Sequence, residues 1–366
     1  MAMSKFMDMC HRSLWVLLAL RLFSAPTVLW AAGGTEAASF LDIPVGAGPA
    51  ALGSAYTALA ADAYAPVWNP AGLGFVDTTQ VAAQHLAYLE SIYDEYLGAA
   101  FKIKKGSALG VSAQYLGTGN IAGSDFNGNA QGSYSSYFGS YNLAYGQKVL
   151  DKLSVGLTGK VINAKIADVA STAYAADLGA LYKVADHATL AATLTNLGTK
   201  LKFLNDDSSL PMQGHLAAAY APDSHWLASL EGVFPKSGPA GARIGLQWSP
   251  VDMIAIRAGY KTDTTKDLGA MAGMTVGAGL KVWGQELAYA WLPYGDLGNT
   301  QYFSFVMRFG ESEKANENLI RGQEIKYHRT VSKGKEDPEG QQLMEILNSG
   351  DEQTAQKNGS PQEPTR

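Results

Sequence analysis

The sequence predicts an all-β protein, a fourteen-stranded antiparallel transmembrane β-barrel with an N-terminal plug and a polar C-terminal tail. Three observations lead to this prediction. The middle of the chain alternates apolar residues with small or polar ones at a period of two. Charged residues make up only 17% of the 366 residues, although the hydrophobic content is an ordinary 47%. The chain also begins with a segment that resembles a secretory signal.

Residues 1–32 have the features of a signal peptide. Lys5 and Arg12 precede an apolar run from Leu14 to Leu20, and small residues follow at 31–33. An arginine interrupts the apolar region, so an uncleaved anchor is the alternative. No later segment is long and apolar enough to cross a bilayer as a helix. The only cysteine, Cys10, lies in this segment, so a mature chain would have no disulfide, catalytic thiol or thiolate metal site.

The segment 78–310 is expected to form the barrel. Leu109, Val111, Ala113 and Tyr115 illustrate the alternation, with Gly, Ser and Gln residues between them. Most of the alternating segments have about the nine to eleven residues that a tilted strand needs to span a bilayer. They are 78–88, 96–103, 108–117, 135–149, 152–166, 174–184, 188–197, 212–221, 225–234, 242–248, 253–261, 271–282, 285–293 and 301–309. An even number is the rule for single-chain bacterial outer-membrane barrels.

A soluble sandwich or barrel would show the same period of two. Its outer face meets water and normally has many Lys, Glu and Thr residues. The polar face here is mostly Gly, Ala and Ser with single charges. The membrane barrel is therefore favoured, because in lipid a closed barrel satisfies the backbone groups of every strand.

The segment 33–77 lacks strand periodicity and is expected to fold into the lumen as a plug, since fourteen strands leave a hole. Residues 50–61 read as a short helix. Asn69 and Pro70 read as the N-cap and first position of another helical turn, which Gly72 or Gly74 would end. The alternative is an ordinary capped turn on the surface.

The run FLDIPVGAGPAALG, followed about ten residues later by ADAYAPVWNPAGL, resembles the N-terminal region of the PorV/PorQ family of outer-membrane proteins, which belongs with the FadL-type barrels. The resemblance identifies a plug motif that includes Asp42, Pro44, Asn69, Pro70 and Gly72. It implies a fourteen-stranded barrel with an N-terminal hatch, located in the outer membrane of a diderm bacterium with both termini in the periplasm.

The resemblance implies two functions of different classes. Proteins similar to PorV act in type IX secretion, where they receive secreted cargo and deliver it to other secretion components. FadL-type proteins instead transport long-chain fatty acids or other hydrophobic compounds. Outer-membrane lipids are expected partners in both cases, and a scaffold without cargo or ligand is a third possibility. Secretion is taken as the main prediction and transport as the alternative.

Charged residues opposite the apolar sets are candidates for the lumen. They have mixed signs, and the main ones are Glu231, Arg243, Arg257, Lys281 and Arg308. An anion conduit would be expected to show a coherent basic ring. Mixed charges more often pair with each other or with the plug, and Glu231 with Arg243 is one conceivable pair.

No motif supports an enzyme, a cofactor or a metal site. Residues 117–122 match a dinucleotide glycine pattern, but no helix pattern follows. The DFNGN stretch, residues 125–129, lacks the acidic density of a calcium loop and reads as a turn. The histidines form no HExxH motif, and no GxSxG motif occurs. A hydrolase built from spatially gathered Ser and His residues is the residual alternative.

The tail, residues 311–366, has 11 acidic and 8 basic residues and few aromatics. It reads as a disordered periplasmic extension, with docking of a periplasmic partner as the competing hypothesis. The net charge of −5 gives no reason to expect nucleic acid as a partner.

Overall fold

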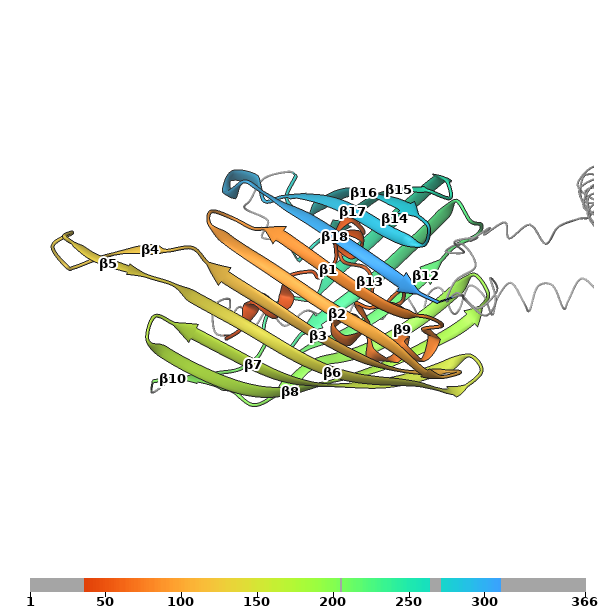
Figure 1. Cartoon of the computed structure of the whole chain (residues 1–366), viewed down its shortest axis with the longest axis horizontal. Coiled ribbons are helices and arrows are strands. Elements are labelled where there is room, and N and C mark those ends of the chain that lie inside the picture. The colour runs from red at the N-terminus through yellow and green to blue at the C-terminus, as the bar shows by residue number, and fades with distance from the viewer. Residues whose placement is uncertain (1–35, 205, 264–270, 311–366) are drawn as a thin grey trace, which may run out of the picture. The chain divides into compact units, whose positions relative to one another are not determined.

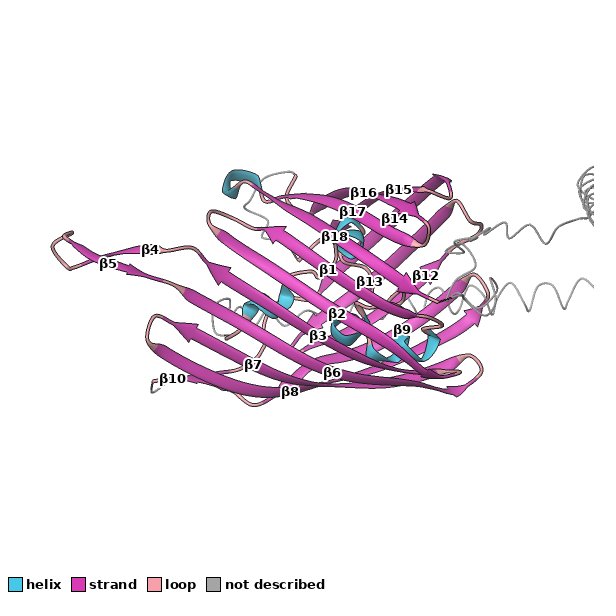
Figure 2. Ribbon diagram, viewed as in Figure 1, coloured by secondary structure: helices cyan, strands magenta, loops and turns pink. Residues whose placement is uncertain are grey.

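A computed structural model describes residues 36–204, 206–263 and 271–310 (Figure 1). They lie in the first of two units of the chain, residues 1–326; the second unit, 327–366, is outside the described residues. The predicted signal peptide, the tail and the location of both termini also fall outside them. Fourteen strands form a closed antiparallel barrel (Figure 2), which confirms the predicted all-β barrel.

Each of the fourteen predicted segments corresponds to one barrel strand. The strands are β1 Thr79–Ala87, β2 Ile92–Lys104, β3 Ser107–Thr118, β6 Ser136–Leu150, β7 Leu153–Ile166, β8 Val169–Ala185, β9 Ala188–Gly198, β12 Gln213–Tyr220, β13 Trp226–Pro235, β14 Gly241–Val251, β15 Ile254–Lys261, β16 Met274–Val282, β17 Gln285–Pro293 and β18 Asn299–Phe309. Neighbours in sequence pair with each other, and β1 pairs with β18 to close the barrel, with Thr79 opposite Phe309.

Two short hairpins outside the barrel were missed in the sequence. One is β4 Ile121–Ser124 with β5 Ala130–Tyr134, which projects beyond β3 and β6 (Figure 1), and the other is β10 Leu201–Phe203 with β11 Asp206–Ser208. The predicted turn in DFNGN joins β4 to β5. The carboxylate of Asp125 accepts hydrogen bonds from the backbone N–H groups of Asn127 and Asn129 at 2.9 and 2.8 Å, as an Asx turn requires.

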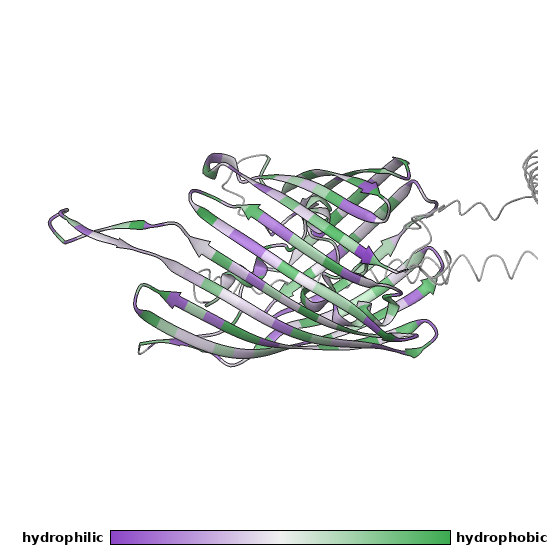
Figure 3. Ribbon diagram, viewed as in Figure 1, coloured by the Kyte–Doolittle hydropathy of each residue, from purple (hydrophilic) through white to green (hydrophobic). Residues whose placement is uncertain are grey.

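Hydrophobic and hydrophilic residues alternate along the strands (Figure 3), and the outward-facing set is strongly apolar. In β14, for example, Ile244, Leu246 and Trp248 are 46%, 49% and 43% exposed, while Gln247 between them is only 6% exposed. A soluble monomer rarely exposes so continuous an apolar surface, which is typical of a barrel in contact with lipid. No helix among the described residues is long and apolar enough to cross a membrane.

The two ends of the barrel differ in their connections. At the end where β18 finishes, five of the six links, at 105–106, 151–152, 186–187, 252–253 and 283–284, are two-residue turns. At the opposite end the links include the long segments 119–135, 199–212 and 262–273. We call these the turn end and the loop end.

Residues 36–78, which we call the inner segment, lie inside the barrel. They contain η1 Ser39–Asp42, α2 Ala47–Ala51, α3 Ala65–Trp68 and η2 Pro70–Phe75, with η4 Gly295–Leu297 the remaining described helix. Their start is held at the loop end, where the Ala37 N–H donates to the Ser209 carbonyl. Helix α2 contacts β15 to β18, whereas η2 contacts β3, β6, β7 and β8 on another part of the wall. The inner segment therefore crosses the lumen from the loop end toward the turn end.

The helix predicted over residues 50–61 is wrong in its extent. Helix α2 covers only Ala47–Ala51, because Gly53 and Ser54 both have φ of 62°, a left-handed conformation that ends the helix. The predicted cap at Asn69 with Pro70 after it is correct. The turn that follows is a 3₁₀-helix that continues through Gly72 and Gly74 to Phe75.

Candidate functional site

Hydrogen bonds hold the inner segment to strands around the barrel. Backbone N–H groups donate to wall side chains, from Gly46 to Gln84, from Ala47 to Ser304 at 3.1 Å, from Gly53 to Thr275 at 2.9 Å and from Thr57 to Glu231 at 3.0 Å. Hydroxyl groups of the wall donate to backbone carbonyls of the inner segment. The pairs are Thr158 with Pro66, Thr189 with Ala58, Thr275 with Ala51 and Tyr96 with Ala63. Nearly all of these wall side chains are uncharged, and they satisfy backbone groups that the short helices leave unpaired.

Glycines on the inner face of the wall allow the backbone of the inner segment to approach closely. A Cβ on Gly259 would lie 2.0 Å from the Gly53 nitrogen, and one on Gly156 would lie 2.2 Å from the Pro70 carbonyl carbon. Gly146, Gly179 and Gly245 are equally crowded by the inner segment. The polar face of the strands is rich in glycine for this reason.

Three residues of the predicted plug motif, Asn69, Pro70 and Gly72, form its most tightly packed part. The Asn69 side chain accepts from the Ala71 N–H at 3.0 Å and donates to the Thr57 carbonyl at 3.0 Å. Asn69 and Pro70 are buried. A Cβ on Gly72 would lie 1.5 Å from the carbonyl oxygen of Ala60, so glycine is required there.

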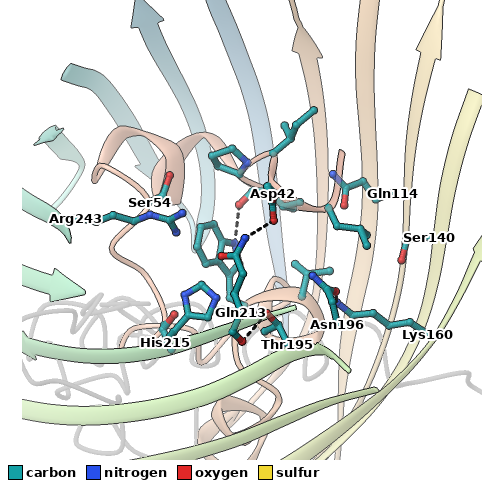
Figure 4. A pocket seen from close by; sticks show the side chains of 17 residues that line it. Asp42, Ser54, Gln114, Ser140, Lys160, Thr195, Asn196, Gln213, His215 and Arg243 are labelled. Carbon is teal, nitrogen blue, oxygen red and sulfur yellow. Dashed lines mark hydrogen bonds between the residues drawn. The ribbon is translucent and has the colours of Figure 1, made fainter. Parts of the chain in front are cut away.

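The other two predicted plug residues, Asp42 and Pro44, border a cavity of about 60 Å³ at the loop-end side of the inner segment (Figure 4). Its lining is mostly polar. The lining side chains from the inner segment are Leu41, Asp42, Ile43, Pro44, Val45, Ser54, Thr57, Val67 and Trp68, and those from the wall and its loops are Gln114, Ser140, Lys160, Thr195, Asn196, Gln213, His215 and Arg243. A carboxylate oxygen of Asp42 accepts from Gln213 Nε2 at 2.6 Å.

The pair suggested from the sequence, Glu231 with Arg243, is present. These residues are cross-strand partners in β13 and β14, and Arg243 Nη1 lies 3.6 Å from Glu231 Oε1. Glu231 is fully buried behind the cavity, and besides Arg243 and the Thr57 N–H it contacts His215 Nδ1 at 2.9 Å. Arg243 also donates from Nη2 to Asp263 at 2.7 Å. The arginine charge is therefore balanced on the wall side.

A second charged group at the cavity is centred on Lys160, which the sequence pattern places on the lumen face but whose partners were not predicted. Lys160 Nζ contacts Asp177 at 2.7 Å and Asn196 Oδ1 at 2.9 Å. Asn196 sits at an irregularity in the β8–β9 pairing with φ of 58°, and its N–H donates to Asp177 at 2.7 Å. The alternation of the strand indicated that Lys160 faces the lumen, but it did not indicate which residues the lysine contacts. A β-bulge has no comparably simple sequence pattern.

The remaining predicted lumen residues lie away from this cavity. Arg257 donates from Nη2 to Glu286 Oε1 at 2.6 Å and from Nε to Gln247 at 2.7 Å. Lys281 lies opposite Glu286 in the β16–β17 pairing. Arg308 donates to the Gly284 carbonyl at 3.1 Å. Basic residues thus lie beside Glu286 in this part of the wall too, as the mixed signs of the lumen charges in the sequence suggested.

No cluster of three or more metal-ligating side chains occurs in the part of the chain that the structure describes. In the charged groups around Glu231 and Glu286, the carboxylates are already paired with Arg243 and Arg257. The arrangement is suited to closing and lining a lumen.

Comparison with known proteins gives similarity at the level of fold. The chain matches no protein-family model and no curated protein. Among solved structures, the CymD monoaromatic hydrocarbon channel is similar with a TM-score of 0.52 and 11% identity, covering 74% of this chain and 99% of CymD. The Pseudomonas putida toluene transporter TodX has a TM-score of 0.46 and 13% identity, and the match covers 66% of this chain and 91% of TodX. A Pseudomonas aeruginosa FadL homologue has a TM-score of 0.47 and 11% identity, covering 76% of this chain and 99% of its own.

At such low identities these likenesses concern the fold alone. PorV and PorQ proteins are not among the solved structures described above. The fold is a closed fourteen-stranded antiparallel barrel, similar to that of CymD.

Proposed function

We propose that this protein is an outer-membrane channel for small molecules and that the inner segment is its gate. The observation that carries the proposal is an apolar-faced barrel whose lumen is crossed by its own N-terminal residues, which are attached to the wall mostly through uncharged side chains. Individual hydrogen bonds of this kind contribute only about 0.5–1.5 kcal/mol net. They are therefore suited to rearrangement during passage.

The outer membrane is the location that best accounts for the exposed apolar face. Outer-membrane barrels have short turns on the periplasmic side and longer loops outside. By that rule the turn end faces the periplasm and the loop end the exterior. The end of β18 then leads into the periplasm, as does the tail that follows it.

Transport is favoured over the secretion role that was the main prediction from the sequence. CymD, whose fold is similar, is described as a channel for monoaromatic hydrocarbons. That description favours movement of small molecules, including the hydrophobic compounds expected from a FadL-type resemblance. No feature of the described residues points to a secreted protein as cargo, so PorV/PorQ membership and type IX secretion stay predictions.

The proposed roles of the plug motif follow from its contacts. Asn69, Pro70 and Gly72 would shape the part of the gate nearest the turn end, and Asp42 and Pro44 the part that borders the cavity. Among the charged residues, Glu231 would fasten the gate through the Thr57 N–H. Arg243, Arg257, Lys281 and Arg308 would keep the wall charges neutralised.

A reversible cross-link tests whether the gate moves. Ala47→Cys and Ser304→Cys join two positions already linked by a hydrogen bond of 3.1 Å. The only other cysteine is Cys10, in the predicted signal peptide. We expect proteoliposomes with the oxidised double variant to lose solute uptake and to regain it with a thiol reductant. Each single variant should behave like the parent protein under both conditions. Equal uptake in the oxidised and reduced states would contradict a moving gate.

A further inference from the structure

The cavity beside the inner segment has a lining unlike that expected for a hydrocarbon site. Apolar cavities remain dry and bind apolar ligands. This one has six apolar side chains in its lining, but the other eleven bring carboxylate, amide, hydroxyl, imidazole, ammonium and guanidinium groups to its surface (Figure 4). A hydrocarbon placed there would remove water from these groups without replacing their hydrogen bonds. Each unsatisfied polar group costs about 1–3 kcal/mol, so a hydrocarbon is the wrong occupant.

The two cationic groups that border the cavity are already neutralised. Lys160 is paired with Asp177 at 2.7 Å, and Arg243 is paired with Asp263 at 2.7 Å. Arg243 also lies 3.6 Å from Glu231. A ligand carboxylate would therefore compete with carboxylates that are already in place, and fatty acids are poorly matched to this site.

Asp42 differs from these carboxylates. Its side chain is exposed to the cavity, and its one hydrogen-bond partner among the described residues is the uncharged amide of Gln213. Its cationic neighbours at the cavity are Arg243 and Lys160, and each of these is paired at 2.7 Å with a different carboxylate, Asp263 and Asp177. Asp42 therefore shares its cationic neighbours with other carboxylates.

Other groups with free hydrogen-bonding capacity border the same cavity. The hydroxyl of Ser54 is buried and has no hydrogen-bond partner among the described residues. His215 is held at Nδ1 by Glu231, which leaves its Nε2 without a partner in the described chain. Trp68 is fixed by a hydrogen bond of 2.9 Å from its Nε1 to the Val45 carbonyl, and its ring also lines the cavity. Aromatic faces attract ammonium groups.

We propose that this cavity binds a small polar molecule carrying a protonated amine, with Asp42 as its ionic partner and Ser54, His215 and Trp68 as neighbouring contacts. The cavity volume of about 60 Å³ holds about four to six water molecules, which corresponds to a ligand of about as many heavy atoms. The inference rests on the proposed transport function, because it names the class of molecule that would pass this point of the lumen.

Ethanolamine is a suitable probe, since it has a protonated amine and a hydroxyl and is small enough for the cavity. Isothermal titration calorimetry on the purified full-length protein in detergent should show saturable binding of ethanolamine. Toluene and acetate should show none. Asp42→Asn should weaken ethanolamine binding at least tenfold, whereas Asp42→Glu should keep it within a few-fold. Asp207→Asn, which removes an exposed carboxylate in β11, is the matched control and should bind like the parent.

Several outcomes would overturn the site. They are no binding of ethanolamine, binding that Asp42→Asn leaves unchanged, and binding of toluene or acetate in competition with ethanolamine. A difference in electrophoretic migration between unheated and heated samples, equal to that of the parent, would exclude misfolding as the reason for a loss in Asp42→Asn, and Asp42→Glu provides a second check. Uptake of solutes into proteoliposomes separates the two proposals. If other solutes enter while ethanolamine does not bind, the amine site fails and the channel stands; if no solute enters, the channel proposal fails.

Discussion

At the scale of single residues, Asn69 shows how a short motif determines local structure. Its side chain caps η2 through the Ala71 N–H and also reaches the Thr57 carbonyl, so one amide joins two parts of the inner segment. The cap and the following proline were predictable, because Asn followed by Pro is a common start of a helical turn. The hydrogen bond to the Thr57 carbonyl was not predictable, since it depends on how the eleven residues between Thr57 and Asn69 fold.

Asn69→Ala should therefore loosen the inner segment without opening the barrel. Leaving the buried Thr57 carbonyl and Ala71 N–H without partners is expected to cost about 1–3 kcal/mol. Limited chymotrypsin digestion should cut the variant faster at Tyr56, Tyr64 or Trp68, which lie inside the lumen. The barrel should keep its heat-sensitive electrophoretic mobility. Unchanged cleavage would show that the amide is dispensable.

Asp42 makes the proposed amine site dependent on pH. Enclosure by protein raises the pKa of its carboxyl to about 7, and the carboxylates of Glu36 and Asp263 add to this increase while Arg243 and Lys160 oppose it. The amine probe needs the ionised carboxylate, so binding should strengthen as pH rises through 7 and level off above it. Between pH 6 and 8 the ionised fraction grows about tenfold, and so should the affinity.

Calorimetry at several pH values checks this expectation. A probe that stays protonated over the whole range is required, and ethanolamine meets that condition. Asp42→Asn should remove the dependence together with the binding. An affinity that falls with rising pH would assign the site to a group other than this carboxylate.

The predicted lumen charges show the limit of sequence reasoning at this scale. Alternation correctly indicated that Arg243 and Glu231 share a face, and they are direct partners in the register. Lys160 with Asp177 was not found, because the two are diagonal neighbours in the β7–β8 register and not direct partners. Asn196, which also contacts Lys160, sits at an irregularity of the β8–β9 pairing and has a positive φ. Register and bulges arise from the assembled sheet, and no local pattern specifies them.

At the scale of secondary-structure elements, the strands were predictable because each alternates over its full length between lipid and lumen. The short hairpin β4–β5 was not predicted, since outside the membrane nothing imposes this alternation. Helix α2 ends earlier than propensity suggests because Gly53 must approach Gly259 in the wall. Tertiary contact overrode local preference at that point.

The wall glycines should act as a docking surface for the inner segment. Gly259→Ala would place a methyl group 2.0 Å from the Gly53 nitrogen, and Gly156→Ala would place one 2.2 Å from the Pro70 carbonyl carbon. Both contacts are with backbone, which cannot swing aside as a side chain does. We expect either variant to displace the inner segment locally and to raise the ion conductance of planar bilayers containing the protein.

Gly159→Ala is the matched control, because its nearest neighbour would be the Leu143 carbonyl oxygen at 4.0 Å. It changes the same residue type in the same strand as Gly156 but meets no steric conflict. Its conductance should equal that of the parent protein. Similar conductance for all three variants would mean that the inner segment adjusts without leaving the wall.

At the scale of the whole molecule, the barrel and the inner segment have separable sources of stability. The wall is closed by β1 with β18, and its outer face is largely apolar, so lipid and strand pairing can support it. The inner segment depends on the wall, since its helices have only four to six residues and are too short to persist alone. Fourteen strands leave space that these helices and the wall side chains fill together.

Deleting residues 37–77 should consequently leave a folded but open pore. The lumen would then be lined by charges of both signs, held in pairs such as Lys160 with Asp177 and Arg257 with Glu286. Paired charges give no coherent ring of one sign, so cations and anions should pass with little discrimination. In planar bilayers we expect stable current steps, absent from the parent protein, and a reversal potential near zero in a gradient of potassium chloride.

Retained heat-sensitive electrophoretic mobility of the deletion variant would verify that the barrel forms. Failure to form it would show that the wall needs the inner segment to fold, and strong selectivity for one ion sign would show that the charge pairs separate once the inner segment is gone.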